Sequence, residues 1–100
     1  MALDFDSLPK QRLIEFCRRN KIRRLALFGS ALREDFNSRS DLDVLVEFEP
    51  GTRVGVSFFS MQDALSGILG REVDLNTPGF LGERVRERVL AEAREIYVAA

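Results

Sequence analysis

The chain has 100 residues, with 15 Lys and Arg against 16 Asp and Glu, no His, no Trp and one Cys. These counts exclude a Ser-His-Asp triad, a Cys-His pair, a histidine metal site, an internal disulfide and a zinc site built from several Cys residues. Carboxylates, Arg side chains, hydroxyls and backbone amides remain, and this set suits a hard cation with a phosphate ligand better than redox chemistry or acyl transfer.

The even charge balance predicts no extended nucleic-acid surface. No apolar run reaches membrane-spanning length, and the N-terminus lacks a basic stretch followed by an apolar one. We therefore expect a single domain over residues 1–100, in the cytoplasm and without membrane contact.

The first element is predicted to be a helix. Ser7 is a candidate N-cap, Pro9 falls in the first turn, and Asn20 and Lys21 close the helix. Cys17 lies on its apolar stripe, so we interpret this residue as part of the core rather than as a nucleophile.

Two strands are predicted next, with a turn of the chain between them. Residues 22–28 read as a strand that Gly29 ends, and residues 30–35 as a short helix. Residues 41–48 alternate between apolar and polar side chains and form the clearest strand of the sequence.

The second half predicts a helix over residues 57–69 that Gly70 ends, a strand over 71–76, and a final amphipathic helix over 82–98. This order favours an α/β (α+β) fold, with a small mixed sheet of about three to four strands and helices packed on one face.

Three Asp residues are the first candidates for chemistry. Asp41 and Asp43 open a strand although Asp is depleted in strands, and alternation puts both side chains on one face. Two like charges at this spacing repel unless a cation lies between them, and Mg²⁺ binds such carboxylates together with substrate phosphates. If the strand of Asp74 lies beside theirs, the three carboxylates form a cluster that holds two metal ions for in-line displacement at phosphorus.

Gly29 and Ser30 stand at the junction of a strand and a predicted helix. Gly permits close approach of the backbone, and a helix start presents free N–H groups to an anion. Ser30 adds a hydroxyl donor, so a phosphate cradle beside the carboxylates is predicted. Arg39 is a candidate phosphate clamp, with a solvated loop Arg as the alternative.

The stretch LFGSALREDFNSRSDLDVLVEF, with Gly-Ser, ten residues and then Asp-x-Asp, resembles the signature of the polymerase beta superfamily. The short chain is similar to the minimal nucleotidyltransferase (MNT) branch, and REVDLNTPG resembles the strand that carries the third carboxylate. The resemblance implies that Asp41, Asp43 and Asp74 are catalytic metal ligands, and that Gly29 and Ser30 contact the triphosphate.

The family resemblance also implies an activity and a partner. Members use Mg²⁺, in a two-metal site, to transfer a nucleoside monophosphate to a hydroxyl, here expected to be AMP from ATP. Minimal members pair with HEPN-domain proteins in toxin–antitoxin systems and adenylylate their partner at a tyrosine. Asp74 then acts as a ligand of the second metal or as the general base.

Two other functions stay open. A binding module would neutralise a toxin by occlusion, with Phe58, Phe59 and the last helix as an apolar docking surface or as ordinary core. A nucleotidyltransferase acting on a nucleic-acid end or a small molecule is less favoured, because of the neutral charge and the absence of an acceptor-binding segment. Base preference, acceptor, metal and a possible homo-oligomer are not determined by the sequence.

Overall fold

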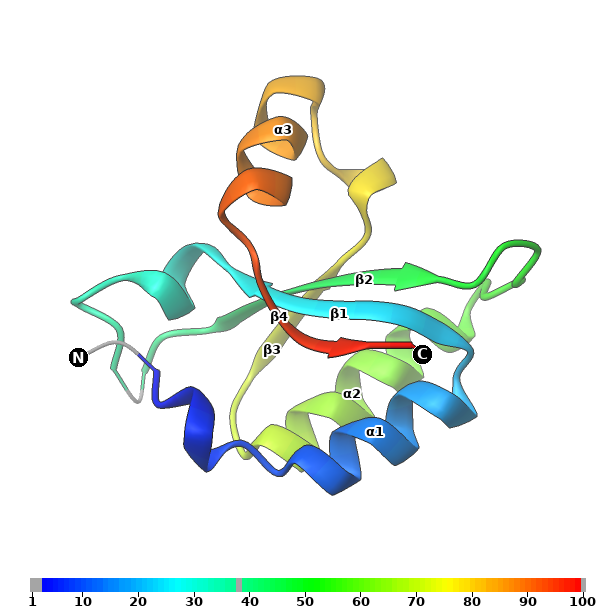
Figure 1. Cartoon of the computed structure of the whole chain (residues 1–100), viewed down its shortest axis with the longest axis horizontal. Coiled ribbons are helices and arrows are strands. Elements are labelled where there is room, and N and C mark those ends of the chain that lie inside the picture. The colour runs from blue at the N-terminus through cyan, green and yellow to red at the C-terminus, as the bar shows by residue number, and fades with distance from the viewer. Residues whose placement is uncertain (1–2, 38, 100) are drawn as a thin grey trace.

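Four strands form one sheet with helices on both of its faces in this computed structural model, which describes residues 3–37 and 39–99 (Figure 1). The elements in chain order are η1 (Phe5–Ser7), α1 (Lys10–Arg19), β1 (Ile22–Phe28), η2 (Gly29–Leu32), β2 (Leu42–Phe48), α2 (Ser57–Leu69), β3 (Val73–Asn76), η3 (Pro78–Phe80), α3 (Glu83–Glu92) and β4 (Arg94–Val98).

The strand order across the sheet is β3-β2-β1-β4. The central strand β1 is antiparallel to both β2 and β4, whereas β2 and β3 are parallel. The parallel pair is connected through α2, as parallel strands require a crossover. The sheet is therefore mixed, as predicted, and its two edges are β3 and β4.

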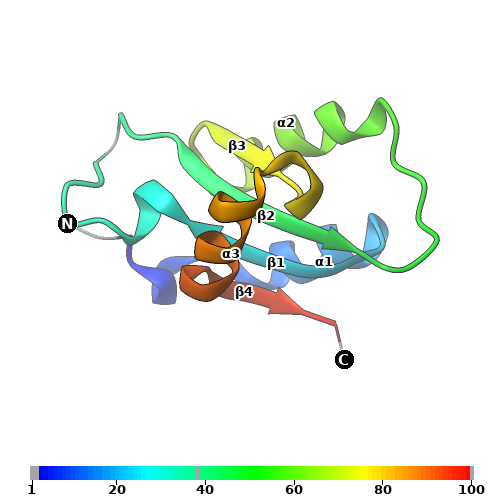
Figure 2. The ribbon, with the colours of Figure 1, turned by 90° about the horizontal axis from the view of Figure 1, so that it is seen from above.

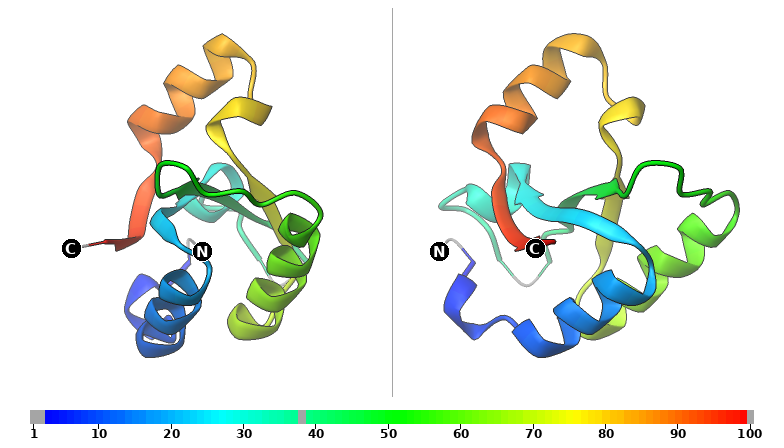
Figure 3. Two further views of the ribbon diagram at one scale, coloured as in Figure 1. Left: turned by 90° about the vertical axis from the view of Figure 1, so that its right-hand side faces the viewer. Right: turned by 45° about the vertical axis from the view of Figure 1, so that its right-hand side comes forward.

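The main core lies between the sheet and the pair α1 and α2, which run along the same face (Figure 3). Alternate residues of β1 and β2 point into it, and the largest fully buried side chains include Leu25, Leu27, Val44 and Val46. Cys17 of α1 is fully buried there, as expected. The prediction of a helix over 57–69 is confirmed at both ends. The helix ends there because Gly70 adopts the left-handed conformation that is typical of a helix C-terminus.

The third helix, α3, lies across the opposite face of the sheet (Figure 2). Val89 of α3 packs on Ala26 and Leu45, the residues of β1 and β2 that point away from the main core. The expected packing of helices on one face thus describes α1 and α2, and α3 forms a second, smaller layer.

The predicted final helix over residues 82–98 is wrong in its second half. The helix α3 ends at Glu92, Ala93 takes an extended conformation (φ −59°, ψ 140°), and the chain returns as β4 to pair with β1. The segment predicted as the last turns of this helix contains Ile96, Tyr97 and Val98, which have high strand propensity. The free edge of β1 supplies its hydrogen-bond partners. Periodicity alone did not distinguish these two outcomes.

Two shorter expectations also need correction. Ser7 does not cap α1: its hydroxyl donates to the Asp4 carbonyl within η1, and α1 starts after Pro9. The helix expected over 30–35 is the four-residue 3₁₀ turn η2, which ends because Arg33 is extended. A single turn carries almost no dipole, so the predicted helix N-terminus for an anion is absent.

None of the helices in the described ranges has the length and apolar content needed to cross a bilayer.

Candidate active site

Asp43 of β2 and Asp74 of β3 are direct neighbours across the parallel pair. The flanking residues Leu42, Val44 and Val73 point into the main core, so both Asp side chains lie on the α3 face of the sheet. Cα atoms of adjacent strands are about 4.8 Å apart, and two carboxylates at this spacing repel each other unless a cation or solvent separates them. The structure thus brings together two of the three predicted carboxylates, from segments 31 residues apart in the sequence.

Asp41 lies immediately before β2, two residues ahead of Asp43, and its side chain is exposed. Its backbone carbonyl accepts a hydrogen bond of 2.5 Å from the Ser30 hydroxyl. This hydrogen bond joins the start of β2 to the Gly29–Ser30 turn. It therefore holds the backbone of Asp41, from which the side chain projects, in a fixed position.

Gly29 and Ser30 form the first half of η2 and face Asp43. The Ser30 backbone N–H donates a hydrogen bond of 3.2 Å to Oδ2 of Asp43. Gly29 has φ +58°, and a Cβ atom there would lie 2.5 Å from the same oxygen. Only Gly fits this position, for its backbone conformation and for its contact. The turn therefore orients Asp43, a role that the sequence did not reveal for these residues.

The donor chemistry of this face suits Mg²⁺. All three candidates are carboxylates, which are the ligands that this cation uses in proteins, and the absence of a side chain at Gly29 lets the Asp43 carboxylate lie against the turn. Oδ2 of Asp43 accepts from the Ser30 N–H, whereas no residue that the structure describes donates to Oδ1. Among residues 3–37 and 39–99, no three acidic or Cys side chains stand close enough together to form a ready metal site. The strand register sets Asp43 beside Asp74 and leaves Asp41 two residues ahead of the pair, and the three side chains do not converge.

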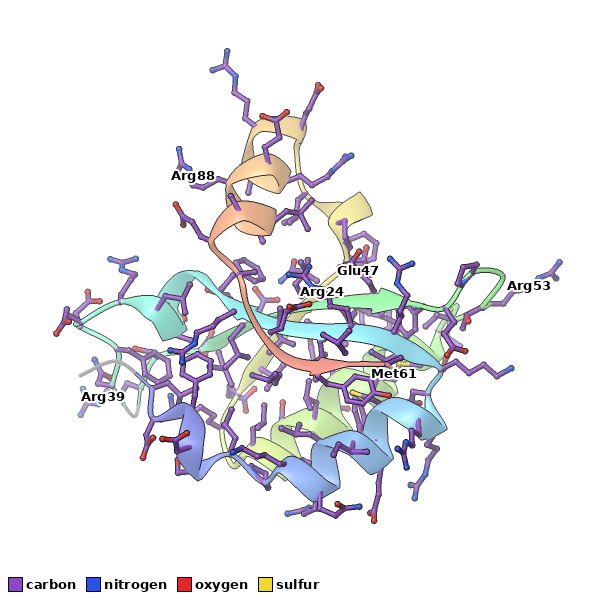
Figure 4. The ribbon with its side chains drawn as sticks, viewed as in Figure 1. Arg24, Arg39, Glu47, Arg53, Met61 and Arg88 are labelled. Carbon is purple, nitrogen blue, oxygen red and sulfur yellow. The ribbon has the colours of Figure 1, made fainter. Side chains whose placement is uncertain are left out.

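No hydrogen bond among the described residues links Arg39 to the three carboxylates. Its side chain is exposed on the loop before β2 (Figure 4), and its backbone N–H donates to Oδ1 of Asn37 at 2.8 Å. Within the described residues no ion pair connects it to Asp41 or Asp43. The role of Arg39 as a phosphate clamp stays a prediction.

An ion-pair network on the same sheet face was not predicted. Arg24 of β1 donates to Glu47 of β2 at 2.8 Å and to Glu95 of β4 at 2.7 Å, and labels in Figure 4 mark Arg24 and Glu47. The hydrogen bond with Glu47 is the largest cause of the raised pKa of Arg24, which burial opposes. The network holds three strands together beside Leu45. Sequence could have located it only if the register of β4 had been known.

The sheet, the crossover through α2 and the paired Asp residues define a nucleotidyltransferase of the polymerase beta-like type. The family model described as "Nucleotidyltransferase domain" matches residues 10–97, and the chain belongs to this family.

The chain is 32% identical over 95 residues to the protein adenylyltransferase MntA of Thermococcus cleftensis, covering 95% of this chain and 93% of that protein. It is 30% identical over 87 residues to MJ0435 of Methanocaldococcus jannaschii, assigned as a protein adenylyltransferase, with coverage of 87% and 92%. A solved structure assigned to the minimal nucleotidyltransferases has 35% identity, a TM-score of 0.73 and coverage of 91% and 94%. The fold is also that of a toxin–antitoxin structure with AMP-PNP (TM-score 0.73, 21% identity).

Proposed function

We propose that this nucleotidyltransferase transfers AMP from ATP to a hydroxyl of another protein, and that the acceptor is a tyrosine of a HEPN-type toxin, for which the chain acts as antitoxin. The observation that carries the proposal is the register that sets Asp43 opposite Asp74, with Gly29 and Ser30 against Asp43. Relatives named protein adenylyltransferase and a neighbour of the same fold described as the toxin–antitoxin MntA-HepT support the acceptor class.

In this reaction the acceptor oxygen forms a bond to the α-phosphorus of ATP, and the bond from that phosphorus to the bridging oxygen of pyrophosphate breaks. The hydroxyl loses its proton, and pyrophosphate leaves with the bonding electrons. Such displacement depends on alignment and on charge stabilisation more than on covalent catalysis, which is compatible with a chain that has no His.

We infer that Asp41, Asp43 and Asp74 would hold Mg²⁺, which supplies charge neutralisation at the triphosphate and a lowered pKa of the acceptor hydroxyl when bound. The Ser30 N–H holds Oδ2 of Asp43, so the rotamer of this carboxylate is set before any ligand arrives. Asp74 is exposed and its carboxylate accepts no hydrogen bond from the described residues, whereas its backbone carbonyl accepts one from the Asn76 side chain, so the carboxylate is available as the proton acceptor. Gly29 lets the Asp43 carboxylate pack directly against the turn, where a side chain at position 29 would displace it. Arg39 is retained as a phosphate contact.

The test incubates the purified chain with α-labelled ATP, Mg²⁺ and a candidate HEPN-type partner protein. We expect label on a tyrosine of the partner, and its loss in Asp43→Asn. Asp63→Asn is the matched control, because Asp63 is an exposed Asp on α2, away from the site. Absence of label with every nucleotide, combined with absence of ATP binding, would refute the proposal.

Neutralisation by binding alone is the second candidate, and two exposed aromatic side chains favour it. Phe59 and Phe80 are 68% and 67% exposed, and both rings contact the buried Phe58 edge-on. Exposed aromatic side chains at this density are typical of protein interfaces. A variant with Asn at positions 41, 43 and 74 that still neutralises the partner in cells would favour this function. The cytoplasmic location stays a prediction.

A further inference from the structure

A groove runs along the outer surface of the helix pair α1 and α2. Three adjoining depressions of about 260, 240 and 410 Å³ form it. The first two share Phe16, Arg19 and Ala64, and the last two share Arg19, Asn20 and Met61, so the depressions are continuous along the helices. In Figure 3 the two helices lie side by side beneath the sheet.

The charge along this groove is strongly unbalanced. The side chains that line it include four cations, Arg12, Arg19, Lys21 and Arg53, against the single anion Glu15. The chain as a whole has 15 basic and 16 acidic residues, so this concentration is not a consequence of composition. None of the four cations takes part in an ion pair within the described residues.

Of the four cations, only Arg19 lies in the last turn of α1, where a favourable interaction with the helix C-terminus explains its presence. Lys21 follows the helix and has a left-handed backbone (φ 55°). Arg53 belongs to the loop between β2 and α2 and extends away from the body of the molecule (Figure 4). Three cations from two separate segments, the end of α1 and the loop before α2, thus surround the widest depression without compensating acids among its lining residues.

The floor of the groove is apolar but offers no ring for stacking. Met61 and Phe16 are 8% and 7% exposed, Ile68 is half-buried and Ala64 is exposed. Single-stranded nucleic acids bind through exposed aromatic rings combined with cations, and the only ring that lines the groove is buried. Aliphatic side chains flanked by cations complement a peptide segment that carries aliphatic and acidic residues.

We propose that the α1–α2 groove is a docking site for an acidic amphipathic helix of a partner protein. The partner's acidic side chains contact Arg12, Arg19 and Arg53, and its aliphatic side chains cover the floor.

The groove and the carboxylates lie on opposite sides of the molecule. Asp43 and Asp74 are on the α3 face of the sheet, and the main core separates that face from α1 and α2. A docked helix therefore leaves the nucleotide face accessible. This inference does not depend on the proposed transfer reaction, since a chain without catalytic activity would still bind through the groove.

Binding of a defined probe tests the inference. The probe is a fluorescent helix-forming peptide of about 16 residues, with Leu along one face and Glu on both flanks. We expect the fluorescence anisotropy of the peptide to rise to a plateau as the full chain is added. Binding should weaken as NaCl rises from about 50 to about 300 mM. The double variant Arg19→Glu with Arg53→Glu should weaken binding at least about tenfold.

The matched control reverses two exposed cations of α3, with Arg84→Glu and Arg88→Glu, and should bind like the unmodified chain. If the variant with Arg19→Glu and Arg53→Glu unfolds, the double variant Arg19→Gln with Arg53→Gln replaces it in the binding test. Asp43→Asn should keep full peptide binding, and Arg19→Glu with Arg53→Glu should keep ATP binding, so that failure of docking and failure of transfer are distinguished. Three results would overturn the inference: no peptide binding, equal losses in both double variants, or tighter binding of oligo(A) than of the peptide.

Discussion

A Cβ atom on Gly29 would lie 2.5 Å from Oδ2 of Asp43, closer than any real side chain can approach a carboxylate. This contact connects the end of β1 with the second residue of β2, and it explains physically why a Gly precedes Ser30 in this chain. The turn and the carboxylate form one unit, so changes in either should affect both stability and nucleotide transfer.

The variant Gly29→Ala should therefore lose transfer and stability together. A left-handed Ala costs about 1–2 kcal/mol, and the clash with Asp43 should add about 1–3 kcal/mol. Gly51→Ala is the matched control: Gly51 has φ +83° but open space around it, so only the backbone cost is expected, with full activity. Urea denaturation and the labelled-AMP assay measure both effects. Equal destabilisation in the two variants would show that the contact with Asp43 is unimportant.

Asp74→Asn should separate activity from stability. Removal of one charge from the Asp43–Asp74 pair relieves repulsion, so the free energy of unfolding without Mg²⁺ should stay constant or rise by at most about 1 kcal/mol. The transfer rate should fall at least about 100-fold, because a metal ligand or base is lost. Thermal denaturation in EDTA and single-turnover transfer provide the measurements. A stability loss would contradict the like-charge interpretation.

Cys17 should make the folded state less stable at high pH. Burial raises the pKa of its thiol from 9.0 to about 12. Between these values the unfolded chain releases the thiol proton while the folded chain keeps it, so stability falls as pH rises, by up to about 1.4 kcal/mol per pH unit. Cys17→Ala should lower stability at neutral pH through a small cavity, but its stability should fall less steeply between about pH 9 and 10.5. Parallel pH slopes in urea denaturation would argue against a buried thiol.

Arg24→Ala should destabilise the sheet by about 1–3 kcal/mol, because Glu47 and Glu95 lose a charged hydrogen-bond donor. The Arg24 side chain is only 20% exposed, so solvent replaces the contact poorly. Arg33→Ala is the control, since Arg33 is 68% exposed and its ion pair with Asp35 is 3.4 Å long; the change should stay within about 0.5 kcal/mol. Chemical denaturation compares the two, and similar losses would contradict the special role of Arg24.

Most of the element order followed from local patterns. The strand over 22–28, the helix over 57–69 and the left-handed Gly70 are confirmed because their periodicity and end signals agree with one another. The last helix failed for the opposite reason. Residues 94–98 fit both a helical stripe and a strand, and the unpaired edge of β1 decided between them.

The features of the candidate site also fall into those that local patterns predicted and those that tertiary contacts decided. Composition without His, the Asp-x-Asp alternation and the Gly-Ser pair predicted carboxylate and phosphate chemistry, since these depend only on residue type and spacing along the chain. The register that pairs Asp43 with Asp74, the Ser30 N–H on Asp43 and the turn in place of a helix over 30–35 depend on contacts between distant segments. The sequence by itself determined which groups are present for chemistry and the side of each strand on which they lie. Only the tertiary structure decided which of them meet, because strand pairing sets distances that no local pattern encodes.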